Sequence, residues 1–447
     1  MSDRKKVVII GGGFGGLSVA KALGGKSVDV TLIDRKNHHV FQPLLYQVAT
    51  AVLSPGEIAS PIRRILHKYP NIEVILGEAV DFDTDAGIVK LVDGCEIEFD
   101  YLVVAAGARH SYFGNDNWET CAPGLKTLED ALEIRRRVLL AFELAERDAS
   151  LTGKHDPLHF VVIGGGPTGV EIAGAIAGIA RQALAKDFKA IDTRTARVML
   201  FEGSGRVLAS FDEDLSEKAK LQLEELGVEV YLGNYVTKIA PGRVEVGGKW
   251  IDCEVAIWAT GVAASPIGSK LGAETDNAGR VKVLPDLSIP EKPNIFVIGD
   301  MAALLQVNGK PVPGIAPAAI QMAASVCENI ERDLTGRTRV DFVFRDKGSM
   351  ATIGKSKAIA QVGRWKFSGF PAWLAWLFVH LISIIGFRNR LSVLSEWFWA
   401  YLTRERSARL ITGDSDEMRN ALRFVEARPE VRVEASSAKS AKKARSG

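Results

Sequence analysis

The sequence predicts an α/β fold with two Rossmann-like dinucleotide-binding domains, followed by a C-terminal helical segment. Three observations lead to this prediction: a glycine turn between a buried strand and a helix, a second copy of that arrangement 153 positions later, and an uncharged, tryptophan-rich stretch near the C-terminus. The chain has 447 residues, too many for one ordinary domain. Its 43 glycines and 47% hydrophobic content suit an α/β protein with many tight turns.

The first glycine turn follows a β-branched run at residues 7–10, which is typical of a parallel strand buried on both faces. The turn has the spacing Gly11-x-Gly13-x-x-Gly16 and leads into a helix-forming stretch that ends at Leu23. Gly11 permits a tight turn, Gly13 lets the backbone approach a pyrophosphate, and Gly16 lets the helix pack close to the strand. The helix N-terminus would then face the phosphates. A glycine turn without a ligand is the alternative.

Two later features complete the site around this turn. The next predicted strand, residues 28–33, ends in Asp34, an acid placed to accept a hydrogen bond from a ribose hydroxyl. A further buried strand, residues 99–104, runs into Ala105-Ala106-Gly107. Small residues at that point let the backbone lie against a flat ligand.

Every part of this arrangement returns in the middle of the chain. The parts are a strand at residues 159–163, a glycine turn at Gly164-Gly165-Gly166-Pro167-Thr168-Gly169, a strand that ends in Glu202, and a closing turn at Ala259-Thr260-Gly261. From Gly11 to Gly107 is 96 positions, and from Gly164 to Gly261 is 97. The matched set indicates two dinucleotide-binding domains.

Two more elements belong to the same core. A long charged helix is expected over residues 127–148, with Thr127 as its N-cap and Asp130 three residues on. We expect this helix to link the two domains. A late buried strand at residues 294–298 ends in Gly299-Asp300.

The C-terminal part has a different character. Five of the eight tryptophans lie between Trp365 and Trp399, and residues 367–387 contain no charged side chain. Aromatic and cationic flanks around an apolar patch are typical of a membrane interface. A helix over residues 372–387 would be about 24 Å long, shorter than the ~30 Å of a hydrocarbon core. We therefore expect it to lie in the interface beside a second helix at residues 391–402. A crossing helix and an apolar homodimer interface are the alternatives.

Charge and cysteine content limit the other functions. The formal net charge of +2 indicates no nucleic-acid partner, and residues 428–447 are expected to form a disordered basic tail. The adjacent His38 and His39 lack metal-ligand spacing, so we expect surface or packing roles for them and predict no metal site. The short basic start is not a signal peptide. A reducing compartment is indicated because the four cysteines are scattered and form no CxxC pair: Cys95, Cys121, Cys253 and Cys327.

With these motifs, residues 5–412 resemble the type II NADH dehydrogenases, which are single-chain NADH:quinone oxidoreductases of the two-dinucleotide-binding-domain flavoprotein class. The resemblance implies a glutathione-reductase-like arrangement, non-covalent FAD, NADH as an exchanging co-substrate, a membrane quinone as acceptor and no proton pumping. It also implies a peripheral, monotopic position at the cytosolic face of the inner (plasma) membrane. The implied domains are FAD-binding at 1–120 and 281–340, NADH-binding at 121–280, and membrane-associating at 341–427, followed by the tail at 428–447.

The resemblance also implies which residues of this chain bind the cofactors, because they occupy positions that match the family's motifs. Those implied for FAD are Gly11, Gly13, Phe14, Gly15, Gly16, Asp34, Arg35, Ala106, Gly107 and Asp300. Those implied for NADH are Gly164, Gly166, Thr168, Gly169, Glu171, Glu202, Gly203, Thr260 and Gly261. Glu202 favours NADH over NADPH because a carboxylate repels a 2′-phosphate, while the nearby Arg206 leaves NADPH open.

Two residues are implied to be catalytic. In the family the counterpart of Glu171 lies near the nicotinamide–flavin contact, which implies proton transfer; an acid favoured near a helix N-terminus is the alternative. Gln321 matches the second glutamine of the family's A-Q-x-A-x-Q quinone motif, which implies a hydrogen bond to a quinone carbonyl. This chain departs from the motif because Pro317 replaces the first glutamine. A buried glutamine bonded to backbone is the alternative for Gln321.

Three rival functions stay open at this point. A sulfide:quinone oxidoreductase has a similar fold but needs redox cysteines near the flavin. A soluble NAD(P)H-dependent flavoprotein reductase of a protein acceptor would have no use for the aromatic C-terminal segment. A non-enzymatic NADH sensor that changes assembly on reduction is the third.

Overall fold

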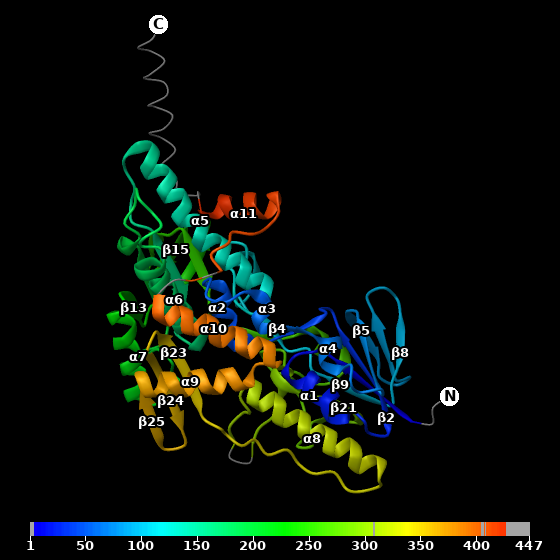
Figure 1. Cartoon of the computed structure of the whole chain (residues 1–447). Helices are drawn as coiled ribbons and strands as arrows, with labels where there is room; N and C mark the ends of the chain where they lie inside the picture. The colour runs from blue at the N-terminus through cyan, green and yellow to red at the C-terminus, as the bar shows by residue number, and fades with distance from the viewer. Residues whose placement is uncertain (1–3, 307–308, 404–405, 407, 426–447) are drawn as a thin grey trace. The chain divides into compact units, whose positions relative to one another are not determined.

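The structure is a computed structural model and describes residues 4–306, 309–403, 406 and 408–425 (Figure 1). The chain divides into two compact units. The first takes the described residues of Met1–Val40, Ala59–Ser111 and Val262–Lys347, and the second takes those of Phe41–Ile58, Tyr112–Gly261 and Gly348–Gly447. The tail expected at 428–447 lies outside the described residues.

The first unit is built around a six-stranded sheet with the order β20-β21-β9-β1-β2-β5. Strand β1 pairs in parallel with β2 and β9, so that Val7 lies opposite Val30 on one side and Tyr101 on the other. Only β20, at the edge, runs antiparallel to its neighbour. The β-branched side chains of β1 are buried, as expected for a strand covered on both faces. Helix α1 packs beside α8, where the Cys327 thiol donates to the Val19 carbonyl at 3.7 Å.

The first unit contains the following helices and strands: β1 Lys5–Ile10, α1 Phe14–Leu23, β2 Val28–Asp34, β3 His38–Val40, β4 Ala59–Pro61, α4 Ile62–Leu66, β5 Ile72–Leu76, β6 Ala79–Asp83, β7 Ile88–Leu91, β8 Glu96–Glu98, β9 Tyr101–Val104, β10 Ala108–His110, β18 Val262–Ala264, β19 Val281–Lys282, β20 Ser288–Ile289, β21 Lys292–Val297, β22 Ala302–Ala303 and α8 Ala316–Leu334.

The second unit repeats the core of the first. Its parallel sheet has the order β13-β12-β11-β17, so β11 lies between β12 and β17 as β1 lies between β2 and β9. Helix α5 begins with the predicted capping box, in which Thr127 accepts from the Asp130 N–H and Asp130 accepts from the Thr127 N–H. The helix ends at Gly153, whose φ of 72° is left-handed.

The second unit contains the following helices and strands: α2 Leu45–Ala49, α3 Pro55–Ile58, α5 Leu128–Thr152, β11 His159–Ile163, α6 Pro167–Gly178, β12 Arg197–Glu202, α7 Glu213–Glu225, β13 Val228–Leu232, β14 Val236–Ala240, β15 Arg243–Val246, β16 Lys249–Asp252, β17 Val255–Trp258, β23 Ser349–Gly354, β24 Lys357–Val362, β25 Trp365–Ser368, α9 Phe370–Ser383, α10 Phe387–Thr403 and α11 Ser415–Val425.

The C-terminal segment of the second unit differs in two ways from the sequence-based expectation. Its first part is a three-stranded antiparallel sheet, β23-β24-β25, which was not predicted. This sheet packs on α6 so closely that a Cβ at Gly174 would lie 1.9 Å from the Ile353 carbonyl oxygen. The predicted helix boundaries were also wrong. Helix α9 stops at Ser383 rather than residue 387, because the backbone of its C-cap, Ile384, is extended, and α10 begins at Phe387 rather than residue 391.

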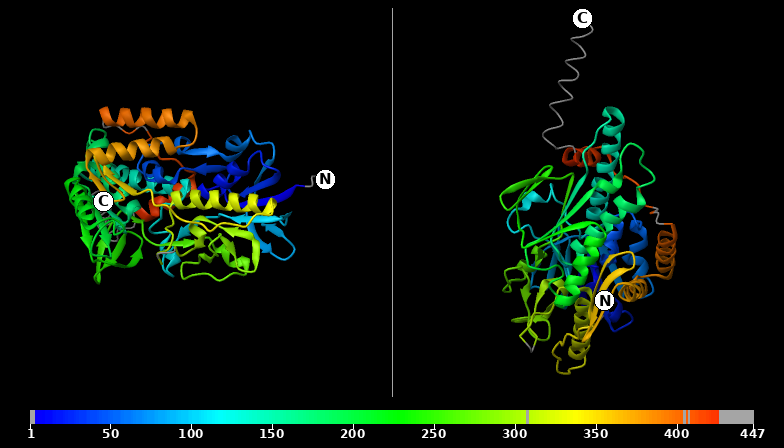
Figure 2. Two further views of the ribbon diagram at one scale, coloured as in Figure 1. Left: turned by 90° about the horizontal axis from the view of Figure 1, so that it is seen from below. Right: turned by 90° about the vertical axis from the view of Figure 1, so that its left-hand side faces the viewer.

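Helices α9 and α10 lie side by side (Figures 1 and 2). The rings of Trp373 and Tyr401 stack between them at 5.6 Å, and Trp376 meets Trp397 at 5.7 Å. Many of their remaining large apolar side chains face solvent. Within the part of the chain that the structure describes, no helix combines the length and the apolar character needed to span a bilayer.

Candidate active site

The glycine turn of the first unit joins β1 to α1. Gly11 has a left-handed φ of 100°, and a Cβ there would lie 2.5 Å from the Ala105 carbonyl oxygen. A Cβ at Gly16 would lie 1.9 Å from the Gly11 carbonyl oxygen, so both positions exclude any larger residue. A Cβ at Gly13 meets no atom within 4 Å, which leaves the backbone at Gly13 open to a ligand. This is the division of roles that a dinucleotide turn requires.

The N-terminus of α1 is suited to an anion. Gly13 occupies the N-cap, no side chain caps the helix, and the first turn has no acidic residue. Helix α6, whose N-cap is Gly166, shares all three properties. By contrast, α5 carries a full capping box and two acids in its first turn. The start of each of these two helices therefore suits a negatively charged ligand.

The strand-end acid of the first unit is fixed to the glycine turn. The Asp34 carboxylate accepts from the Gly12 N–H at 2.5 Å and from the Lys36 N–H at 2.7 Å. These two bonds orient the carboxylate and leave it further capacity to accept from a ribose hydroxyl.

The second unit reproduces this geometry. Gly164 has a φ of 111°, a Cβ at Gly169 would lie 1.8 Å from the Gly164 carbonyl oxygen, and a Cβ at Gly166 meets no atom within 4 Å. The Glu202 carboxylate accepts from the Gly165 N–H at 2.5 Å and from the Ser204 N–H at 2.7 Å. The two turns thus match in the contacts of their glycines and in the two backbone hydrogen bonds to the strand-end acid.

His39 is a candidate site residue that sequence reasoning missed. It is 3% exposed, and its Nδ1 lies 2.9 Å from the Gly12 carbonyl oxygen. Burial lowers the pKa of the imidazole, so the ring is neutral at pH 7. Its buried Nε2 has no hydrogen-bond partner among the described residues. The ring of Phe14 packs edge-on against it at 5.1 Å. A buried nitrogen without a hydrogen-bond partner beside the glycine turn indicates that a ligand supplies the partner.

The other FAD candidates lie in the first unit, close to the ends of its strands. A Cβ at Gly15 would lie 3.1 Å from the Ile298 side chain. Arg35 follows β2 and is paired with Glu78 at 3.7 Å on the surface. The turn after β9 is half-buried at Ala106 and Gly107, and Asp300 follows β21 with its carboxylate facing Gly314.

The remaining NADH candidates lie in the second unit. Thr168 is in the first turn of α6, and Thr260 and Gly261 form the half-buried turn after β17. Gly203 lies beneath the ring of Tyr235, because a Cβ at Gly203 would lie 2.3 Å from a ring carbon. A larger residue at Gly203 would displace this exposed ring.

Glu171 lies on α6, within the second unit. Burial raises the pKa of its carboxyl group to about 8, although a hydrogen bond from the Thr352 backbone opposes the shift. The group is therefore predominantly protonated at pH 7. Burial and the Glu171 charge together raise the pKa of Tyr46 well above its usual range, and the Arg406 guanidinium opposes this shift.

A buried hydrogen-bonded chain leads from Tyr46 to α10. The Gln47 Nε2 donates to the Tyr46 hydroxyl at 2.7 Å, and the Trp397 Nε1 donates to the Gln47 Oε1 at 2.7 Å. Arg406 donates to the carbonyls of Thr50 and Ala175 at 2.6 and 3.0 Å, which ties the loop around Tyr46 to α6.

Gln321 lies on α8 in the first unit, and its amide is bonded to backbone. Its Nε2 donates to the Arg345 carbonyl and its Oε1 accepts from the Arg345 N–H, both at 3.0 Å. The second N–H of the amide has no acceptor among the residues described. Pro317, which replaces the other motif glutamine, occupies the first turn of α8.

The cysteines show no thiol redox centre. All four lie in the described part of the chain, and none of them forms a disulfide bond. Cys327 is buried against α1, and burial raises the pKa of its thiol to about 12. Such a thiol is a poor nucleophile at pH 7.

Comparison with known proteins decides the family. Residues 5–323 match the model of the pyridine nucleotide-disulphide oxidoreductases, and residues 347–405 match the NDH2 C-terminal domain. The type II NADH:quinone oxidoreductase Ndh of Mycobacterium tuberculosis is 44% identical over 452 residues, which cover 98% of this chain and 96% of that protein. This chain belongs to the type II NADH:quinone oxidoreductase family. The family resemblance and the fold class predicted from the sequence are thereby confirmed.

Solved structures agree with the fold of this type II oxidoreductase. NDH2 of Plasmodium falciparum, solved in complex with NADH, superposes with a TM-score of 0.83 at 20% identity, covering 92% of this chain and all of that one. The sulfide:quinone oxidoreductase of Aquifex aeolicus superposes with a TM-score of 0.67 at 20% identity, covering 95% and 96% of the two chains. At these identities the likeness concerns the fold alone.

Proposed function

We propose that this type II oxidoreductase transfers hydride from NADH to non-covalently bound FAD and passes two electrons onward to a membrane quinone, without pumping protons. When bound, FAD supplies the two-electron redox chemistry. The observation that carries the proposal is the pair of matching glycine turns, at Gly11 and Gly164. One turn can hold the FAD, which stays bound through the reaction cycle, while the other binds NADH and releases NAD⁺.

The first unit is proposed to hold FAD. The open backbone at Gly13 and the uncapped N-terminus of α1 would meet the pyrophosphate, and Asp34 would accept from the ribose. The buried Nε2 of His39 would gain a partner there, and Asp300 would bind the ribitol chain.

The second unit is proposed to hold NADH through the same contacts. The backbone at Gly166 and the start of α6 would meet the pyrophosphate, and Glu202 would accept from the adenosine ribose. The small residues at Thr260 and Gly261 would lie against the bound coenzyme.

Glu171 is proposed to supply a proton. NADH delivers a hydride and a quinol carries two hydrogens, so the overall reaction takes up one proton. A carboxyl group with a pKa of about 8 holds a proton at pH 7 and can release it and regain it. Tyr46 and Gln47 would fix the surroundings of that carboxyl group through their hydrogen bond.

Gln321 is proposed to donate the second N–H of its amide to a quinone carbonyl. Its bonds to the Arg345 backbone hold the amide plane in one orientation, so the remaining N–H has a set direction.

Helices α9 and α10 are proposed to attach the enzyme to the membrane surface. Phe378, Phe387 and Phe398 are 65%, 81% and 63% exposed, which leaves a large apolar area in water. Burying such side chains in lipid is favourable, and helices that lie in the interface need not span the bilayer. The cytosolic face is proposed because cysteines that form no disulfide bond suit a reducing compartment. A homodimer through this surface is the competing proposal.

The central test is rapid mixing of the flavin-loaded enzyme with NADH, NADPH or sulfide, followed by quinone. NADH is expected to bleach the flavin absorbance fastest, and quinone is expected to restore it. Bleaching by NADH with no recovery on quinone addition would contradict quinone as the acceptor. Bleaching by sulfide alone would favour the sulfide:quinone oxidoreductase alternative.

Replacing Phe378, Phe387 and Phe398 together with serine is expected to weaken binding to lipid vesicles at least about 100-fold, because each buried aromatic ring contributes roughly 1.5–3 kcal/mol. Co-sedimentation with vesicles measures the effect. Leu151→Ser is the control, since Leu151 is 78% exposed on α5 and outside this surface. Point substitutions are preferred to truncation of the C-terminal segment, because a truncation that removed β23 would also expose the face of α6 against which β23 packs. Unchanged sedimentation of the triple variant, with a dimer lost instead, would favour the homodimer interface.

A further inference from the structure

The loop that follows Glu202 is tied to the second glycine turn. The Leu208 N–H donates to the Gly165 carbonyl at 2.7 Å, while the Gly165 N–H donates to the Glu202 carboxylate at 2.5 Å. Residues 203–208 therefore lie beside the turn that is proposed to hold the NADH pyrophosphate. The adenosine ribose, which Glu202 is expected to bind, must be near this loop.

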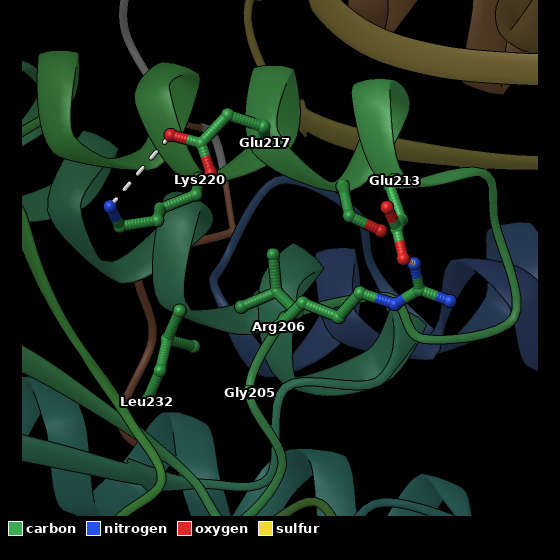
Figure 3. Close-up of a pocket in the computed structure, with 8 residues that line it drawn as sticks. Gly205, Arg206, Glu213, Glu217, Lys220 and Leu232 are labelled. Atoms are coloured by element: carbon green, nitrogen blue, oxygen red, sulfur yellow. Dashed lines mark ion pairs between the residues drawn. The ribbon is translucent and has the colours of Figure 1, made fainter.

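A cavity of about 330 Å³ opens between this loop and α7 (Figure 3). Leu232, which lines it, pairs in register with Glu202 on the neighbouring strand, so the cavity adjoins the ribose-binding acid. Figure 3 shows the side chain of Arg206 directed toward Glu213 and that of Lys220 directed toward Glu217. A second cavity, of about 480 Å³, is lined by Arg206, Glu213 and Lys366 among others.

All three basic residues that line these cavities in the described chain are paired with acids. The Arg206 guanidinium lies 3.1 Å from the Glu213 carboxylate, and it also donates to the Ala209 carbonyl at 3.1 Å. Lys366 is 2.9 Å from both Asp212 and Asp214. Lys220 lies between Glu217 and Glu224, at 3.9 and 3.6 Å. A phosphate that entered this region would meet only cations already neutralised.

Arg206 is the cation of this group best suited to a phosphate, since its guanidinium can donate two parallel N–H bonds. It is also the one on the loop beside the ribose. Glu213 begins α7 next to the acids Asp212 and Asp214, so the helix start is negatively charged rather than open to an anion.

We infer that Glu213 is a specificity-determining residue that holds Arg206 in an ion pair and thereby selects a coenzyme with a free 2′-hydroxyl over one with a 2′-phosphate. The inference rests on the function proposed above and extends it to a second carboxylate beyond Glu202. Glu202 repels the 2′-phosphate directly, whereas Glu213 withholds the cation that would bind it.

Glu213→Gln is expected to raise the NADPH-to-NADH ratio of kcat/KM about fivefold to tenfold, because the released Arg206 can form charge-assisted bonds to the phosphate. The double variant Arg206→Gln/Glu213→Gln is expected to lose this gain. Asp148→Asn is the matched control: it breaks another exposed pair, with Arg147 at 3.0 Å, away from both cavities. Its ratio is expected to equal that of the wild type.

Calorimetric binding of adenosine 2′,5′-bisphosphate to the flavin-loaded enzyme gives a second readout. Glu213→Gln is expected to tighten this binding about fivefold, and the double variant is expected to return it to the wild-type value. Glu213→Asp shortens the side chain by one methylene and so moves the carboxylate away from Arg206. We expect it to raise the NADPH-to-NADH ratio and the bisphosphate affinity by less than Glu213→Gln does. It replaces Glu213→Gln in the test if the glutamine variant folds poorly. An unchanged ratio and unchanged binding in flavin-loaded Glu213 variants would overturn the inference, as would a gain that persists without Arg206. Failure of the proposed function would appear separately, as absent flavin bleaching by NADH in the wild type.

Discussion

Replacing Gly166 with valine is expected to leave a folded, flavin-loaded enzyme whose kcat/KM for NADH falls at least about 100-fold. No atom lies within 4 Å of a Cβ at this position, and its φ of −71° is one that valine adopts. The fold therefore has room for the side chain. The pyrophosphate does not, because the valine would occupy the space through which the backbone N–H groups of α6 reach it. Each charge-assisted hydrogen bond lost costs about 1.5–3 kcal/mol.

The same substitution in the first copy is expected to have a different result. Gly13 also has open space at its Cβ and an ordinary φ of −70°. Gly13→Val should therefore yield a folded chain that purifies without flavin. Absorbance at the flavin bands and circular dichroism distinguish loss of cofactor from loss of fold.

Gly169→Val supplies the control for a glycine that the fold itself requires. A Cβ there would lie 1.8 Å from the Gly164 carbonyl oxygen, so we expect this variant to misfold. Loss of flavin in Gly166→Val, with retention in Gly13→Val, would show that the two cofactor assignments are reversed.

The parts of this molecule that could be predicted from sequence are those set by neighbours along the chain. The strand–turn–helix order around Gly11 and Gly164 specifies the two parallel sheets. The strand-end acids Asp34 and Glu202 were predicted from their sequence positions alone. In the structure each of them accepts a hydrogen bond from its glycine turn. The capping box at Thr127 is likewise a relation between residues three apart.

The parts that could not be predicted depend on contacts between distant residues. Trp397 and Gln47 are 350 positions apart, and nothing in either local pattern indicates that they share a hydrogen bond. Residues 41–58 show little periodicity, yet they fold with the second unit, where the half-buried Arg406 donates a hydrogen bond to the Thr50 carbonyl. His39 was interpreted as a surface or packing residue because a histidine pair has no metal-ligand spacing. Only the structure shows its unpartnered Nε2.

Glu171→Gln is expected to remove a pH dependence of stability that we expect of the wild type between about pH 5 and pH 8. Burial raises the pKa of this carboxyl group from 4.5 to about 8 in the folded chain. Between these values the folded state keeps a proton that the unfolded state has released. The contribution of Glu171 to the free energy of unfolding therefore falls as pH rises, by about 1.4 kcal/mol per pH unit, and levels off above pH 8.

Urea unfolding of the flavin-loaded protein at several pH values measures this contribution as the difference between wild type and variant. Glutamine preserves the size of the side chain and the acceptor for the Thr352 backbone, but it carries no titrating proton. Glu217→Gln, on the exposed face of α7, is expected to keep the wild-type slope. A wild-type slope that persists in Glu171→Gln would mean that the carboxylate is already ionised in the fold. A buried carboxylate without its proton has nothing to donate at neutral pH, so the proposed proton transfer from Glu171 would be excluded by the same measurement. A slope that disappears would instead place a neutral, proton-bearing carboxyl group beside Tyr46, which is the state that the proposed mechanism requires.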